Sequence, residues 1–185
     1  MAPLTALGVE LQRCRSGGDH GNRGPEAAAV VHGGADVFVI CEQSAERSTS
    51  AWAADAGTGE IRMAFTMDLP QVEGASGDVY RVAGASAVPG SHTDVLVLFA
   101  YWAPGTGNRI KLSRVRLPAA GSAALDAPAV LRPAPVVELS SVAGGYPMDN
   151  YEAVVAQPLP GDGRRVVHLV SDDNFQRWAG GGNQR

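Results

Sequence analysis

Short apolar stretches alternate with glycine-rich turns along most of the chain. Stretches of about four to eight apolar residues bounded by turn residues are typical of β-strands. The apolar positions show little helical periodicity, so we predict an all-β protein without a long helix. The predicted strands cover residues 1–12, 27–31, 37–41, 50–54, 61–67, 83–88, 95–101, 110–117, 136–139, 153–157 and 166–170.

The predicted strands fall into repeated units. In the first unit, the turn His32–Asp36 joins two strands and the turn Asp55–Gly59 joins two more. Four short strands within about forty residues are the profile of one β-propeller blade. The pattern recurs when Glu26 is aligned with Gly84 and then with Glu152. Such self-similarity predicts an array of small sheets.

About three such units fit into the 185 residues, whereas a propeller needs roughly four to eight blades to close. We therefore predict a partial β-propeller of about three blades, with an incomplete ring, over residues 1–177. Residues 178–185 are predicted to be an unstructured glycine-rich tail. An incomplete ring leaves an unpaired edge beside Val166–Val170, which favours self-association.

The strand at 110–117 raises a question of register. Strict alternation puts Ile110 and Leu112 on one face of the strand and Val115 and Leu117 on the other, so both pairs cannot point inward. We therefore predict a β-bulge near Ser113–Arg114. Residues 118–135 are rich in alanine and proline and are predicted to be a linker or a long loop.

Charge and hydropathy exclude some partners. The net charge is −4, so no basic surface indicates a nucleic-acid partner. No stretch approaches the roughly 18 apolar residues of a membrane-spanning helix, so we expect no membrane partner. The first five residues lack the basic and long apolar regions of a signal peptide.

The two cysteines, Cys14 and Cys41, show no zinc-type spacing. Cys41 lies within an apolar strand and is predicted to be a small buried residue. A disulfide with Cys14 is the alternative that the sequence leaves open.

Common catalytic signatures are absent from the sequence: it contains no G-x-S-x-G motif and no Walker P-loop. The four histidines show no metal-binding spacing. His32 and His92 lie in or beside predicted turns, so we expect them to be exposed.

Acidic residues stand at matching places in the units. Glu26 and Glu152 lie at the starts of two strands, while Glu42 and the cluster Asp172–Asn174 follow the paired strands. In an antiparallel hairpin the start of one strand and the end of the next lie at the same edge, so these acids should be neighbours. Carboxylate and amide oxygens suit Ca²⁺ or Mg²⁺ and can activate water against a phosphate ester. The alternative is structural, because Asp and Asn also favour turns.

Three segments that carry these residues resemble a known family. Asn22–Ala27 is similar to its N-R-G-x-E-A-L-A segment. Val95–Ile110 is similar to its L-L-V-L-E-R-x-x-S-P-x-x-G-x-x-x-R-I segment. Asp149–Ala153, with Leu169–Phe175, resembles its D-N-x-E-G-L and L-V-S-D-D-N-F segments. The family is the one described as esterase-like activity of phytase.

The resemblance implies a secreted or periplasmic, propeller-like domain that hydrolyses a small phosphate ester. The guanidinium groups of Arg23 and Arg109 suit phosphate oxygens. A solvated surface position is the alternative for each of them. The expected catalytic residues are Glu152, Asp172 and Asp173. The expected Ca²⁺ ligands are Glu26, Glu42, Glu152 and Asp172. The expected substrate-binding residues are Arg23, Arg109, Asn150 and Asn174.

The chain also departs from the family pattern. Ala100 and Gly84-Ala85 stand where acidic residues are common in the family, and residues 178–185 lack a final strand pattern. Domains of the family are longer than this chain, so we expect the chain to hold the C-terminal portion of one. The alternatives to a hydrolase are a non-catalytic propeller used for binding and an inactive truncated fragment.

Overall fold

The computed structural model describes Cys14 and residues 24–43, 45–104, 106–120, 128–141, 150–161 and 163–172. This part of the chain is all-β, as predicted. The predicted strand at 1–12 and the predicted tail at 178–185 lie outside it. Its elements are β1 (Pro25–Val31), η2 (His32–Gly34), β2 (Asp36–Cys41), β3 (Ser48–Asp55), β4 (Ile61–Asp68), β5 (Arg81–Ala87), β6 (Asp94–Ala103), β7 (Gly107–Arg116), β8 (Ala129–Leu131), β9 (Ala134–Ser140), β10 (Asn150–Pro158) and β11 (Arg165–Asp172).

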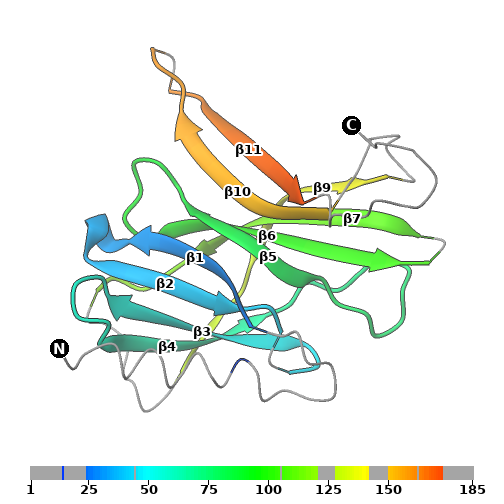
Figure 1. Cartoon of the computed structure of the whole chain (residues 1–185), viewed down its shortest axis with the longest axis horizontal. Coiled ribbons are helices and arrows are strands. Elements are labelled where there is room, and N and C mark those ends of the chain that lie inside the picture. The colour runs from blue at the N-terminus through cyan, green and yellow to red at the C-terminus, as the bar shows by residue number, and fades with distance from the viewer. Residues whose placement is uncertain are drawn as a thin grey trace.

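The strands form three sheets (Figure 1). The first sheet has the order β1-β2-β3-β4-β8, the middle sheet β5-β6-β7-β9, and the third sheet β10-β11. Neighbouring strands are antiparallel, except that β8 pairs with β4 in parallel. The predicted hairpins are therefore confirmed, and three units are present.

The predicted linker at 118–135 is wrong in part. Ala129–Leu131 forms β8 and pairs with Phe65, Thr66 and Met67 on the edge of the first sheet. Leu131 is 4% exposed and belongs to the main core. Burial of this apolar residue gives the segment a reason to pair, which its alanine and proline content did not reveal.

The middle sheet packs on both of its faces. Strand β5 contacts β1 of the first sheet and β10 of the third. The larger core fills the space between the first and middle sheets and includes Phe38, Phe65 and Phe99. A smaller core joins the middle sheet to β10 through Leu98, Leu112 and other apolar side chains.

This two-sided packing explains the strand at 110–117. Ile110 and Leu112 belong to the smaller core, while Val115 and Leu117 belong to the larger one. The pairing of β7 with β6 is regular, and the register shifts only on the β9 side, between Leu112 and Ser113. The extra residue at this shift is Val136 of β9, so the predicted bulge within the strand at 110–117 is wrong. Regular alternation satisfies both apolar pairs because both faces of the strand are buried.

A disulfide covers the outer face of the first sheet. Cys41 is fully buried, as predicted, but it is bonded to Cys14, with 5.5 Å between the two Cα atoms. Trp52 packs against the pair. The alternative that the sequence left open is therefore the one found.

His32 is not exposed, contrary to prediction. Its side chain is 4% exposed, and its ring contacts Asp36 through Nδ1 at 2.6 Å and the Pro118 carbonyl oxygen through Nε2 at 3.0 Å. Asp36 is fully buried and also contacts Arg62 at 2.9 Å. A buried carboxylate is stable only with such partners, so the contact with Asp36 accounts for the burial of the His32 side chain.

The three sheets do not close into a ring within the described residues, and their arrangement is compatible with a partial propeller. In the described part of the chain β11 pairs with β10 alone, so self-association through its other edge stays a prediction. No helix in this part is long and apolar enough to cross a membrane.

Candidate functional site

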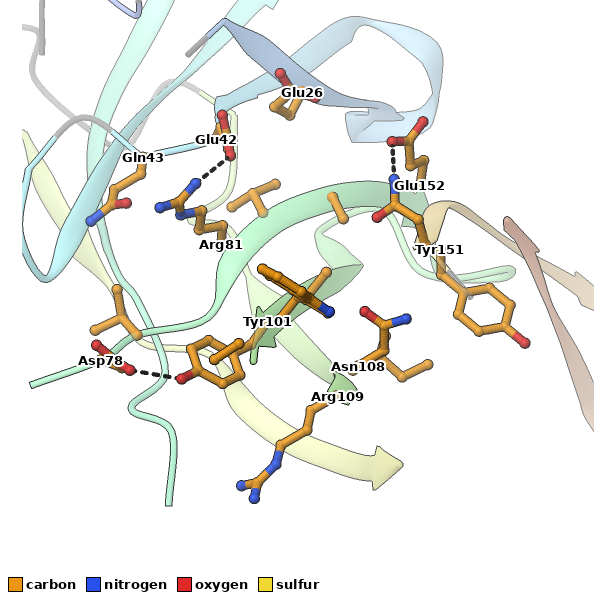
Figure 2. Close-up of a pocket in the computed structure, with 18 of the residues that line it drawn as sticks. Glu26, Glu42, Gln43, Asp78, Arg81, Tyr101, Asn108, Arg109, Tyr151 and Glu152 are labelled. Atoms are coloured by element: carbon orange, nitrogen blue, oxygen red, sulfur yellow. Dashed lines mark hydrogen bonds and ion pairs between the residues drawn. The ribbon is translucent and has the colours of Figure 1, made fainter. Parts of the chain in front are cut away.

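A pocket of about 690 Å³ opens where β1, β5 and β10 come together (Figure 2). These are the first strands of the three sheets. Their N-terminal ends and the C-terminal ends of their partner strands supply much of the lining. The pocket residues used below are Glu26, Glu42, Arg81, Ala83, Ala100, Tyr101, Trp102, Arg109, Asn150 and Glu152.

Each of the three first strands has a register shift at the same place. The shifts lie between Pro25 and Ala27, between Val82 and Gly84, and between Tyr151 and Ala153. The extra residues are therefore Glu26, Ala83 and Glu152. A bulge bends its strand and re-aims the extra side chain. The alignment of Glu26 with Gly84 is thus wrong by one residue, since Ala83 occupies the matching position.

The partner strands bring a second residue to each bulge. The Glu42 amide donates a hydrogen bond of 3.0 Å to the Gly24 carbonyl oxygen. Ala100 pairs with Arg81, and Asp172 pairs with Asn150. We define three corners by these residues. The first corner is Gly24, Glu26 and Glu42; the middle corner is Arg81, Ala83 and Ala100; the third corner is Asn150, Glu152 and Asp172.

The first and third corners are acidic and act on each other across the pocket. Partial burial of its carboxylate, followed by the negative charges of Glu42 and Glu152, raises the pKa of Glu26 above its usual value. The charges of Glu42 and Glu152 raise the pKa because a nearby negative charge disfavours ionisation of Glu26. In the third corner, Asn150 Nδ2 donates a hydrogen bond of 2.6 Å to Glu152 Oε1 and so orients that carboxylate.

The middle corner has a cation and two methyl groups instead of acids. Arg81 Nη1 lies 3.4 Å from Glu42 Oε1, and the Arg81 side chain is 53% exposed. Sequence reasoning missed Arg81. Arg81 lies two residues before the bulged residue, the place that Asn150 holds in the third corner, but the one-residue error in the alignment put Val82 there.

Aromatic and basic residues form the opposite wall of the pocket. Tyr101 donates a hydrogen bond of 2.7 Å to Asp78, and Trp102 is 65% exposed. Arg109 Nη1 donates to the Glu73 carbonyl oxygen at 3.0 Å. Figure 2 shows the Arg109 guanidinium directed away from Glu26, Glu42 and Glu152.

A polar cluster supports this wall from behind. The hydroxyl of the fully buried Tyr80 donates a hydrogen bond of 2.7 Å to Glu138 Oε1, and Lys111 Nζ lies 2.8 Å from Glu138 Oε2. Burial disfavours the charged form of Glu138, but the hydrogen bonds from Lys111 and Tyr80 and the positive charges of Lys111 and Arg109 together lower the pKa of Glu138. The cluster ties β9 to β7 behind the pocket.

The structure thus brings together five of the residues predicted from sequence: Glu26, Glu42, Arg109, Asn150 and Glu152 line one pocket. Asp172 holds the paired position beside Asn150 on β11. Three predicted site residues, Arg23, Asp173 and Asn174, lie outside the described residues. Within the described ranges, no group of three or more His, Cys, Asp or Glu side chains is arranged to hold a metal ion.

The comparisons with known proteins point to one family. The family described as "Phytase-like: Esterase-like activity of phytase" matches residues 7–175, which is most of the chain. No curated protein and no solved structure matches this chain.

Proposed function

Because the chain belongs to the Phytase-like family, described as esterase-like activity of phytase, we propose that it hydrolyses a phosphoric ester in the pocket between the three corners. One observation carries the proposal: matching bulges in separate sheets turn Glu26 and Glu152 into the same pocket. Two carboxylates in different surroundings are a common arrangement for paired acid and base catalysis.

In the proposed reaction Glu152 is the general base. Its carboxylate is exposed and oriented by Asn150. It takes a proton from a water molecule as the water oxygen attacks phosphorus. Glu26 has a raised pKa, so it holds a proton more readily and donates it to the alcohol oxygen as the P–O bond breaks. We assign Asp172 of the third corner, and Asp173, the next residue in the sequence, to the same machinery.

Calcium binding is an alternative to the acid–base roles above, because a carboxyl group that holds a proton does not also bind Ca²⁺. Carboxylate oxygens are suitable Ca²⁺ ligands, and Glu26, Glu42, Glu152 and Asp172 are the expected set. The described side chains alone do not form a complete set, since no group of three is arranged around one ion. When bound, Ca²⁺ would neutralise charge on the phosphate.

Hydrolysis of an aryl phosphate and of phytate tests the proposal. Glu152→Gln is expected to lower kcat by about 100-fold or more, because the side chain keeps its shape but can no longer accept the proton. The matched control is Glu60→Gln, an exposed acid in the turn between β3 and β4. An equal loss in both variants, or no loss in Glu152→Gln, would contradict the assignment. Measurements with chelator and with added Ca²⁺ test the metal separately.

A second candidate function is non-catalytic binding. The middle corner favours it, because Ala83 and Ala100 supply no catalytic group where the other two corners supply acids. A folded protein that binds phosphate esters but does not hydrolyse them, with or without Ca²⁺, would support this candidate.

We also propose that the protein works outside the reducing cytoplasm. Disulfides persist in oxidising compartments, and the Cys14–Cys41 bond closes over the buried outer face of the first sheet. Reduction is expected to lower the thermal unfolding midpoint. An unchanged midpoint after complete reduction would remove this support.

A further inference from the structure

We propose that Arg81 binds the phosphate group of the substrate, which makes the middle corner an anion-binding position between two acidic corners. This inference rests on the proposed function and extends it by naming the residue that selects the substrate charge. The binding itself can be measured without turnover.

The first argument is position. Arg81 occupies the place in the middle corner that Gly24 and Asn150 occupy in the other two. It is therefore set beside a bulge at the same edge of its sheet as the acids. Its guanidinium shares the pocket with Glu26, Glu42 and Glu152 (Figure 2).

The second argument is space. The bulged residue of this corner is Ala83, and the residue paired with Arg81 is Ala100. Both line the pocket with a single methyl group. In the other corners these places hold larger acidic side chains. Because Ala83 and Ala100 are small, there is room beside the Arg81 guanidinium for a group with several oxygen atoms.

The third argument is the capacity of the guanidinium. A guanidinium has five N–H donors, and its planar shape suits two phosphate oxygens at once. Within the described residues Arg81 contacts Glu42 through one nitrogen at 3.4 Å, which is long for a charge-assisted hydrogen bond. The side chain is 53% exposed, so the remaining donors can reach a ligand.

The fourth argument is that the other basic side chain of the described lining points elsewhere. Arg109 donates to the Glu73 carbonyl oxygen at 3.0 Å and is directed away from the three acids. A phosphate near Glu26, Glu42 and Glu152 meets repulsion. Arg81 is the cation placed among these carboxylates to offset that repulsion.

Titration of the full-length protein with inorganic phosphate, in the presence of chelator, tests the inference by calorimetry. Arg81→Gln is expected to weaken phosphate binding by about tenfold, and Arg81→Lys by less, because lysine keeps the charge but not the fork. Glu42→Gln is expected to strengthen binding, because it releases Arg81 from its ion pair. Glu46→Gln is the control, since it removes a charge from the same pocket without touching Arg81.

The opposite effects of Arg81→Gln and Glu42→Gln on phosphate affinity separate a ligand-binding role of Arg81 from a structural one. If Arg81 served only to hold Glu42, the Arg81→Gln variant would bind phosphate as tightly as the wild type does. The affinity of Glu42→Gln for phosphate would then increase by no more than that of Glu46→Gln. Either result overturns the inference, as does a wild-type protein that binds no phosphate. Circular dichroism checks that each variant is folded. If Arg81→Gln unfolds, Arg81→Lys provides a second test, because it keeps the charge at this half-exposed position.

The two proposals fail in different ways. If no ester is hydrolysed but phosphate binding shows the expected pattern, the role of Arg81 stands and the hydrolase assignment falls. If Glu152→Gln abolishes hydrolysis while Arg81→Gln binds phosphate normally, the hydrolase assignment stands and the role of Arg81 falls. In an active enzyme, Arg81→Gln should raise KM more than it lowers kcat.

Discussion

The middle and third sheets share one corner geometry but differ in what surrounds it. Both have a bulge in the first strand, at Ala83 and at Glu152. The middle sheet has apolar side chains buried on both faces. The third sheet is a hairpin that buries Val154 against the middle sheet and exposes Val155 and Val170.

The difference teaches that the same corner geometry can carry different side chains in sheets that are packed differently. The sheet packed on both sides fixes the backbone, and the corner that it carries has no acid. The sheet packed on one side carries Glu152, whose carboxylate is exposed to solvent. A repeated backbone feature therefore carries an acid in one sheet and a small residue beside Arg81 in another.

The largest expected effect comes from the centre of the middle sheet. Phe99 on β6 is fully buried, so Phe99→Ala should lower the free energy of unfolding by about 3–5 kcal/mol because it leaves a large cavity. Val170→Ala on the third sheet should change it by less than about 0.5 kcal/mol, since Val170 is 55% exposed. Urea unfolding of both variants measures the contrast. Equal losses would show that the two sheets contribute alike.

The contact between the two sheets should give the next largest effect. A Cβ atom on Gly84 would lie 3.1 Å from Ala153 Cα and 3.2 Å from the Glu152 carbonyl oxygen. Gly84→Ala must therefore push β10 away, at a cost of about 1–2 kcal/mol. It should also lower kcat, because Glu152 moves.

The control for this prediction is Gly57→Ala in an exposed turn. There the closest atom to the new Cβ would be Asp55 Oδ1 at 3.4 Å, the end of a side chain. Chemical denaturation and hydrolysis assays on both variants test the contact. Full activity in Gly84→Ala would mean that the spacing of β5 and β10 does not position Glu152.

A smaller effect should follow from the polar cluster behind the pocket. Tyr80→Phe removes the hydrogen bond to Glu138 and should cost about 1 kcal/mol at neutral pH. The pKa of Glu138 is lowered in the folded protein. Its stabilising contribution is therefore present above the unfolded pKa of about 4.5 and is lost as the pH falls through the lower folded pKa.

The difference in unfolding free energy between wild type and Tyr80→Phe should accordingly shrink upon acidification below about pH 4.5. Thermal unfolding across a pH series measures it. A difference that stays constant down to strongly acidic pH would show that Tyr80 does not stabilise the ionised carboxylate.

The smallest expected effect lies at the acidic corners and has the opposite sign. The pKa of Glu26 is raised, so its contribution to stability is greatest below the unfolded pKa and is lost as the pH rises through the folded pKa. Glu26→Gln should slightly raise the unfolding midpoint at pH 7, with no gain at pH 4. The gain is small because solvent screens an exposed group.

The same variant also tests the calcium proposal. If Ca²⁺ binds at the corners, added Ca²⁺ should raise the midpoint of the wild type more than that of Glu26→Gln. An equal response of the two proteins would remove Glu26 from the proposed ligands. A lower midpoint of Glu26→Gln in chelator at pH 7 would contradict the repulsion among the three carboxylates.

Much of the fold could be predicted because its signals are local. Short apolar stretches and glycine turns identified β1 to β7, β9 and the β10–β11 hairpin. The linker prediction failed at β8 because its three residues pair with β4, which is distant in sequence. The proximity of Glu26 and Glu42 followed from the antiparallel hairpin alone, since such a hairpin returns to the edge where it began.

The amino-acid sequence by itself determined most of the strands, the three units and the family, because turn chemistry and apolar stretches are local signals. Only the tertiary structure decided that the middle sheet is buried on both faces, that Ala83 rather than Gly84 matches the bulged acids, and that Arg81 stands among them. Stacking of separate sheets sets these features, and it depends on contacts between residues far apart in the chain. A bulge also shifts which side chain faces the pocket by one residue, and residue spacing alone does not reveal that shift.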